Sequence, residues 1–196
     1  MGLDMYLYAE KYESKYNWVG ERNLTESERK QVVDEFYPED LRELGYINLK
    51  HNFLSKETKY QIGYWRKFNA LQGWFIKKFT ADETGHGIYL YKEDVDDLID
   101  ILQQVKDDLD KCKVKVNNEK VGETWENGIK SDIIEEVETY DSDIARRLLP
   151  TTKGFFYGSQ LYDDWYKEDI EYSLELFKEA RKLMDLDYEI VYRASW

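Results

Sequence analysis

The residues best suited to hold a ligand lie three apart in the middle of the chain. Arg66, Asn69 and Gln72 share a face if residues 57–79 are helical, because positions three or four apart are neighbours on a helix surface. A guanidinium group binds a carboxylate or phosphate through two parallel hydrogen bonds, and amide side chains bind a base edge or a peptide. Trp65 adds a ring for stacking. The pattern predicts a small-ligand site. The structural alternative is an arginine paired within the core.

A second candidate segment, TTKGFFYGS, is bounded by glycines and rich in aromatic residues. Glycine lets the backbone approach a ligand closely, and Ser159 is placed to cap the helix that follows. No GKS or GKT is present, so the segment is not a phosphate loop. We predict no cofactor and a binding surface that combines both segments: Trp65, Arg66, Asn69, Gln72, Phe156, Tyr157 and Trp165.

Carboxylates offer a different chemistry, in which the protein is a small hydrolase or transferase acting on a nucleotide. Candidates are Asp4, which alternates out of an apolar strand, together with Asp164 and Asp169. A catalytic carboxylate should titrate abnormally and lie in a cleft beside Arg66. Asp164 and Glu168 are one helical turn apart, but without a third fixed ligand they predict no metal site.

Covalent and zinc chemistry find little support. Cys112 has no histidine near it in the sequence, and His51 and His86 lie in expected loops far from it. No GxSxG elbow is present. A single cysteine permits no disulfide within the chain, which fits a reducing cytoplasm.

Composition restricts the partners. The 196 residues carry a net charge of −13, which argues against binding along a nucleic-acid backbone. No segment reaches the ~20 apolar residues that span a bilayer, so no membrane partner is expected. Aromatic residues make up 16% of the chain and favour either an aromatic core or a binding surface. Another protein and a second copy of the chain remain alternative partners.

The fold expected around these residues is α+β, with several helices packed on a small, mainly antiparallel sheet. Residues 57–79 have apolar positions on more than one side at helical spacing, which predicts a central, buried, aromatic-rich helix. Alternation over residues 3–8 and 188–193 predicts strands near both ends of the sequence, and we expect them to pair.

Three further helices follow from capping and periodicity, over residues 25–36, 93–111 and 161–184. Thr25 and Glu28 match a capping box, and Pro38 ends the first of these helices. Shorter helices are expected over 133–139 and 144–149. We predict a single domain, 1–196, with an insertion or hairpin at about 111–130 that turns at Asn117-Asn118.

Several stretches taken together resemble a family of uncharacterised phage and prophage proteins. They are MGLDMYLYAEKY at the start, YWRKFNALQGWF in the centre, LLPTTKGFFYGSQLYDDWYKEDIEYSLE later on, and YRASW at the end. Members of this family usually have Ile-His in place of Leu71-Gln72, so the departure argues against histidine chemistry. Some members carry a phosphoglycerate kinase label, but this chain is about half the length of such a kinase and lacks a phosphate loop.

These observations predict a non-enzymatic phage or prophage accessory protein that binds a small anionic ligand or a host protein. A nucleotide immune signal is the specific ligand that the resemblance suggests. The carboxylate enzyme described above is the alternative.

Overall fold

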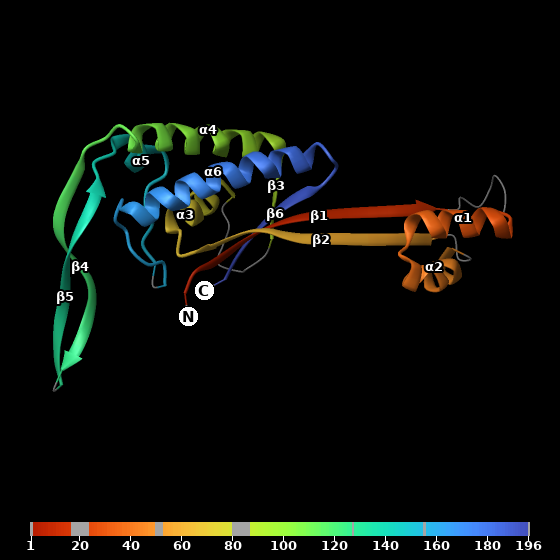
Figure 1. Ribbon diagram of the computed structural model, residues 1–196, viewed down its shortest axis with the longest axis horizontal. Helices are drawn as coiled ribbons and strands as arrows, with labels where there is room; N and C mark the ends of the chain where they lie inside the picture. Colours follow the sequence, from red (N-terminus) through yellow and green to blue (C-terminus); the bar gives the residue numbers. More distant parts are fainter. Residues whose placement is uncertain are drawn as a thin grey trace. The chain divides into compact units, whose positions relative to one another are not determined.

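The computed structural model describes residues 2–16, 24–49, 53–79, 87–126, 128–154 and 156–195, and they form an α+β structure. Figure 1 shows helices and strands following the sequence from the red N-terminal strand to the blue C-terminal strand. The strands are β1 (Asp4–Tyr16), β2 (Phe53–Arg66), β3 (Ile88–Leu90), β4 (Val114–Glu126), β5 (Ile129–Tyr140) and β6 (Glu189–Ser195). The helices are α1 (Glu26–Phe36), α2 (Arg42–Leu49), α3 (Asn69–Phe79), α4 (Lys92–Leu109), α5 (Asp143–Leu148) and α6 (Asp164–Met184), with a short 3-10 helix at Glu39–Leu41.

Contacts between Cα atoms divide the chain into two compact units. Unit 1 comprises Met1–Ala9 and Tyr60–Trp196, and unit 2 comprises Glu10–Lys59. The division of 1–196 into domains stays a prediction. No helix among the described residues is long and apolar enough to cross a membrane.

The main sheet joins segments that are far apart in the sequence. Its strand order is β2-β1-β6-β3, so the first and last strands are hydrogen-bonded neighbours, as predicted. β3 pairs antiparallel with β6, with Leu90 opposite Ile190. This arrangement places the start of the chain, the end of β2 and the end of the chain in one sheet.

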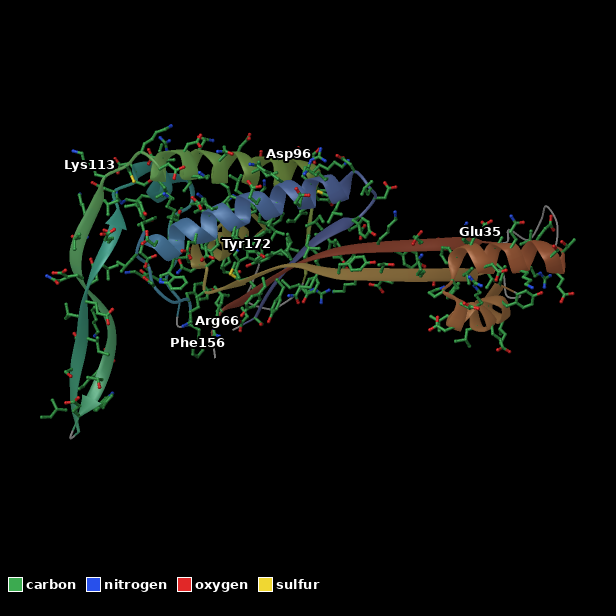
Figure 2. All side chains as sticks on the ribbon, in the orientation of Figure 1. Glu35, Arg66, Asp96, Lys113, Phe156 and Tyr172 are labelled. Carbon is green, nitrogen blue, oxygen red and sulfur yellow. The ribbon has the colours of Figure 1, made fainter. Side chains whose placement is uncertain are left out.

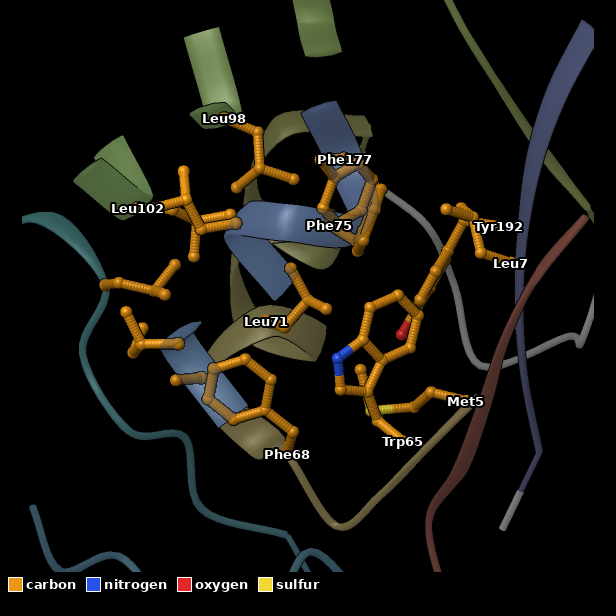
Figure 3. Close-up of a cluster of buried hydrophobic side chains, with 14 of the residues drawn as sticks. Met5, Leu7, Trp65, Phe68, Leu71, Phe75, Leu98, Leu102, Phe177 and Tyr192 are labelled. Atoms are coloured by element: carbon orange, nitrogen blue, oxygen red, sulfur yellow. The ribbon is translucent and has the colours of Figure 1, made fainter. Parts of the chain in front are cut away.

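The core of unit 1 forms where the helices cover one face of this sheet. Leu3, Met5 and Leu7 on β1 are completely buried, while Asp4 and Tyr6 between them are partly exposed. This is the expected period of a half-buried strand. Figure 3 shows the inward side chains of β1 meeting residues of α3, α4 and α6, among them Leu71, Leu98 and Phe177.

The predicted central helix over residues 57–79 is wrong in its first half. Residues up to Arg66 belong to strand β2, and only Asn69–Phe79 are helical. Gly63 lies in this strand and packs closely on α6, because a Cβ there would lie 2.3 Å from Leu176 Cδ2. Pairing with β1, a contact between distant residues, overrides the local apolar spacing.

Residues 111–140 contain a hairpin, but it is longer than predicted and turns elsewhere. β4 and β5 pair antiparallel from Val114 opposite Tyr140 to Glu126 opposite Ile129. The turn includes Gly128 rather than Asn117-Asn118, and its φ of 78° is one that glycine adopts readily. Residues 133–139, predicted to be a short helix, are part of β5.

The other predicted helices are confirmed to within a few residues. Thr25 and Glu28 form the predicted reciprocal capping box at the start of α1, in unit 2. A small core closes unit 2, formed by Val33, Phe36, Leu49 and Leu54. In unit 1, α4, α5 and α6 cover the segments predicted as helices over 93–111, 144–149 and 161–184.

Candidate functional site

The turn between β2 and α3 positions two adjacent cationic side chains. Lys67 has a φ of 64°, in the left-handed region that residues other than glycine rarely adopt. Two backbone hydrogen bonds hold it there: Lys67 N–H donates to Leu3 O at 2.8 Å, and Asn69 N–H donates to Lys67 O at 2.8 Å. Arg66 and Lys67 are both exposed. Neither has an ion-pair or hydrogen-bond partner for its side chain among the described residues.

The Lys67 side chain passes between two glycines. A Cβ built on Gly158 would lie 3.0 Å from Lys67 Cβ and Cδ, and one on Gly2 would lie 3.3 Å from Lys67 Cε. Gly158 itself has a φ of 83°. Larger residues at either position would displace the lysine stem, so the two glycines define its path.

Asn69 fixes the segment that follows Pro150. Its amide nitrogen donates to the carbonyl oxygens of Tyr157 at 3.0 Å and Ser159 at 2.6 Å. Its oxygen accepts the backbone N–H of Thr152 at 2.8 Å. Both amide N–H groups and one lone pair of the oxygen are therefore used within the protein, and Asn69 holds this segment against the start of α3.

A cavity of about 450 Å³ lies beside Asn69 in unit 1. It brings together residues from β2, the β2–α3 turn, α3, the 151–161 segment and the start of α6. They are Tyr64, Trp65, Arg66, Lys67, Phe68, Asn69, Thr151, Ser159, Leu161, Asp163, Trp165, Tyr166 and Asp169. Four residues of the predicted surface therefore border one cavity: Trp65, Arg66, Asn69 and Trp165.

A second cavity of about 830 Å³ adjoins the first. It is bordered by hairpin residues, among them Lys120 and Glu136, and by the segment from Gly158 to Trp165. Lys67 and Trp165 border both cavities. Trp165 is 77% exposed, which is unusual for so large an apolar ring.

Two residues of the predicted surface, Trp65 and Gln72, form hydrogen bonds within the core. Trp65 is 2% exposed, donates its indole N–H to Ser173 Oγ at 2.8 Å and stacks on Phe177. Gln72 is also buried, and its side-chain oxygen accepts a hydrogen bond from the Tyr192 hydroxyl. Both side chains lie within the core of unit 1.

Phe156 and Tyr157 border neither cavity. Leu3 links the segments that contain Arg66 and Phe156, both labelled in Figure 2, through its backbone. Its N–H donates to Phe156 O at 3.2 Å, and its carbonyl accepts from Lys67. Tyr157 is buried, with its carbonyl held by Asn69. Phe156 and Tyr157 therefore contribute backbone carbonyl groups that hold the segment in place, through Leu3 and Asn69.

Two carboxyl groups face the smaller cavity. Asp163 caps α6 by accepting the Tyr166 N–H at 3.0 Å, and burial raises its pKa. Burial, assisted by the charges of Glu168 and Asp163, raises the pKa of Asp169 to about 7. At neutral pH Asp169 is therefore a mixture of the acid and the carboxylate. A general acid or base works best when its pKa lies near the working pH in this way.

The other carboxylates named from the sequence lie elsewhere. Asp4 accepts a hydrogen bond from the Tyr64 hydroxyl at 2.5 Å, which raises the pKa of that tyrosine, and it borders neither cavity. Asp164 accepts from Tyr140 at 2.7 Å and raises the pKa of Tyr140 to about 12. Asp164 borders only the larger cavity.

The described residues include no cluster of three or more His, Cys, Asp and Glu side chains placed to hold a metal ion. His51 and His86 lie outside the described residues. Burial raises the pKa of the Cys112 thiol, so that it is less nucleophilic at neutral pH than an exposed cysteine.

No protein-family model, characterised protein or solved structure matches this chain. The site must therefore be interpreted from its own geometry. Lys67 was not among the residues predicted from the sequence to form the binding surface. Its left-handed backbone and its passage between Gly2 and Gly158 depend on contacts between distant segments, and its residue type carries no signal of either.

Proposed function

We propose that this chain is a binding protein for a small, ring-bearing organic anion, which is held in the cavity beside Arg66, Lys67 and Trp165. The observation that carries the proposal is the position of Lys67. The backbone of Lys67 has a conformation that suits glycine. Its cationic side chain extends between two glycines to the border of two cavities.

The backbone of Lys67 is the first support. A left-handed residue with a Cβ costs about 1–2 kcal/mol, and glycine would remove that cost. Strained residues concentrate at ligand sites, where the surrounding structure holds them in place. The lysine stem also excludes larger side chains at Gly2 and Gly158, so both positions are glycine where the Lys67 side chain passes.

The charges of the cavity are the second support. The chain has 41 acidic residues against 28 Lys and Arg. Many of its cations are paired, for example Lys106 with Asp110 at 2.6 Å. Arg66 and Lys67 have no ion pair among the described residues, although Asp163 and Asp169 border the same cavity. Two adjacent unpaired cations suit the carboxylate or phosphate of a ligand.

Trp165 supplies the remaining recognition. An exposed indole at the border of both cavities can stack on a flat ring whose anionic group reaches Arg66 and Lys67. A nucleotide combines a ring with phosphate, and the resemblance to phage and prophage proteins favours a nucleotide immune signal. Under this proposal the chain is an accessory protein that sequesters the signal in the bacterial cytoplasm.

The test is to denature protein purified from cells that make candidate signals and to identify what it releases by mass spectrometry. An intact anion at one per chain, absent from Arg66→Ala and Lys67→Gly, supports the proposal. Release of nothing by the wild type, together with no binding of those signals in calorimetry, contradicts it and directs the search to a host protein.

Lys67→Gly separates a loss of binding from a loss of stability. This variant should lose the ligand while its free energy of unfolding stays unchanged or rises. Asp187→Gly is its matched control. Asp187 also has a φ of 64° and borders neither cavity, so the substitution relieves the same backbone cost without removing a ligand contact. A Lys67→Gly protein that unfolds more easily and still carries the anion would show that Lys67 is structural.

A second candidate function is acid–base catalysis on the bound anion, and Asp169 favours it. The pKa of Asp169, raised to about 7, suits proton transfer at neutral pH, and the group shares a cavity with Arg66. This proposal expects a processed nucleotide among the released compounds. Asp169→Asn should then retain the intact nucleotide and form no product, whereas continued product formation would eliminate Asp169 as the acid or base.

A further inference from the structure

A third cavity in unit 1, of about 520 Å³, lies outside the site described above. It is bordered by α3, α4, α5 and the segment after Pro150. Its residues are Gly73, Trp74, Lys77, Lys78, Ile101, Arg147, Leu148, Pro150 and Thr152. Three of them are cations and none is acidic, in a chain whose net charge is −13. We propose that this cavity is a second ligand site, which binds a flat ring carrying a carboxylate or phosphate.

The cations fall into two contrasting kinds. Lys78 is held by Asp94 at 3.0 Å and Asp97 at 2.8 Å, and its ammonium lies 5.1 Å from the centre of the Trp74 ring. Lys77, its neighbour, is exposed and has no ion pair among the described residues. The Lys78 charge is therefore already neutralised, and the Lys77 charge is available to a ligand.

Arg147 repeats this contrast on α5. Its neighbour Arg146 forms ion pairs with Asp141 at 2.7 Å and Asp143 at 2.9 Å. Arg147 is exposed and forms no ion pair within the described part of the chain. The helix dipole stabilises cations near a helix C-terminus, which accounts for Lys77 and Arg147 in the last turns of α3 and α5. It does not account for two cations, unpaired among the described residues, that border one cavity with no described carboxylate in its lining.

The walls between these charges are apolar and firmly held. Trp74, Ile101, Leu148 and Pro150 provide carbon surface. A Cβ built on Gly73 would lie 2.0 Å from Thr152 Oγ1, so α3 and the segment after Pro150 are in close contact there. Asn69 fixes the same threonine through its backbone N–H. A mostly apolar cavity of a few hundred Å³ with a few convergent polar groups is typical of small-ligand sites.

This combination defines the ligand class. The apolar walls favour a ring, and Lys77 with Arg147 favours an anionic group on it. Neither an uncharged ring nor an inorganic anion would use both features. The carboxylate and phosphate forms share the same chemistry, and the experiment distinguishes them.

The experiment follows the NMR signal of the Trp74 indole N–H, which is assigned by its loss in Trp74→Phe. The probes are phenyl phosphate and benzoate, with phenol as the uncharged ring and inorganic phosphate as the anion without a ring. We expect saturable movement of the Trp74 signal with at least one of the two ring-bearing anions. Phenol and inorganic phosphate should bind at least roughly tenfold more weakly, since each lacks one of the two interactions.

Lys77→Ala/Arg147→Ala should weaken binding of the ring-bearing anion by roughly tenfold or more. The matched control is Lys111→Ala/Lys113→Ala, which removes two exposed cations that border none of the three cavities. Arg66→Ala should leave the Trp74 response unchanged, which separates this site from the first. The proposal is overturned if neither anion moves the signal saturably, if phenol or inorganic phosphate binds equally well, or if the double variant binds like the control.

Discussion

Lys67 lies against Gly158 so closely that a Cβ on the glycine would be 3.0 Å from two carbons of the lysine stem. The two residues are 91 positions apart in the sequence. Lys67 borders both cavities of the candidate site, and Gly158 borders the larger one. Both have positive φ angles, 64° and 83°. The contact joins the turn before α3 to the segment before α6, and the proposed anion site depends on it.

Gly158→Ala should destabilise the fold and displace Lys67. The alanine incurs a left-handed backbone cost of about 1–2 kcal/mol. Crowding against the lysine stem adds roughly 1 kcal/mol or more. Gly128→Ala is the matched control, because Gly128 has a φ of 78° but open space around its Cα. Urea unfolding of both variants measures the difference, and equal losses would show that the Lys67 contact contributes nothing.

Asn69→Ala should lower the free energy of unfolding by about 2–4 kcal/mol. The substitution leaves the Thr152 N–H and two carbonyl oxygens without the partner that now satisfies them. Urea unfolding measures the loss, with Asn118→Ala at an exposed position of β4 as the control. A loss no greater than that of the control would mean that water replaces the three hydrogen bonds.

Gln72 and Tyr192 should be energetically coupled. Tyr192→Phe leaves the buried Gln72 oxygen without its donor, at a cost of about 1–3 kcal/mol, and Gln72→Leu strands the hydroxyl in the same way. The double variant should lose less than the sum of the two single losses. A double-mutant cycle by urea unfolding measures this coupling, and strict additivity would refute the buried pair.

The raised pKa of Asp169 should make stability fall as pH rises. Its pKa is 3.8 when fully solvated and about 7 in the folded chain, so the folded state binds the proton more tightly between these values. The stabilisation is therefore fully present below pH 3.8 and is lost as pH rises toward 7. At 1.36 kcal/mol per unit, the change is at most about 4 kcal/mol.

Asp169→Asn should remove most of this decline. Unfolding free energies of the wild type and the variant, measured at a mildly acidic and a mildly alkaline pH, give the comparison. Glu189→Gln, at an exposed position, controls for the loss of one negative charge. If Asp169→Asn declines with pH as steeply as the wild type, Asp169 is not the group responsible.

Local sequence patterns were sufficient for much of the fold. The Thr25–Glu28 capping box, the apolar stripe of α4 and the alternation of β1 each depend on residues close in the sequence. Such patterns reflect the helical and strand periods directly. They also led to the correct pairing of the terminal strands and to the α+β class.

The same patterns failed where contacts between distant residues decide the structure. Residues 57–66 have helical spacing, yet they form β2 because β1 pairs with them. The register of β4 in the hairpin likewise depends on its partner β5. Residues 133–139 of β5 have apolar residues at a spacing that suggests a helix. Local periodicity contains no information about such partners.

The candidate site divides in the same way. From the sequence alone, side-chain chemistry identified Arg66 and Trp165 as groups able to bind an anion and a ring, and both border one cavity. Only the tertiary structure assigned Asn69 and Gln72 to internal hydrogen bonds and brought Lys67 between two glycines. The physical reason is that residue type determines which bonds a side chain can form, whereas burial and partners distant in the sequence determine which of those bonds remain for a ligand.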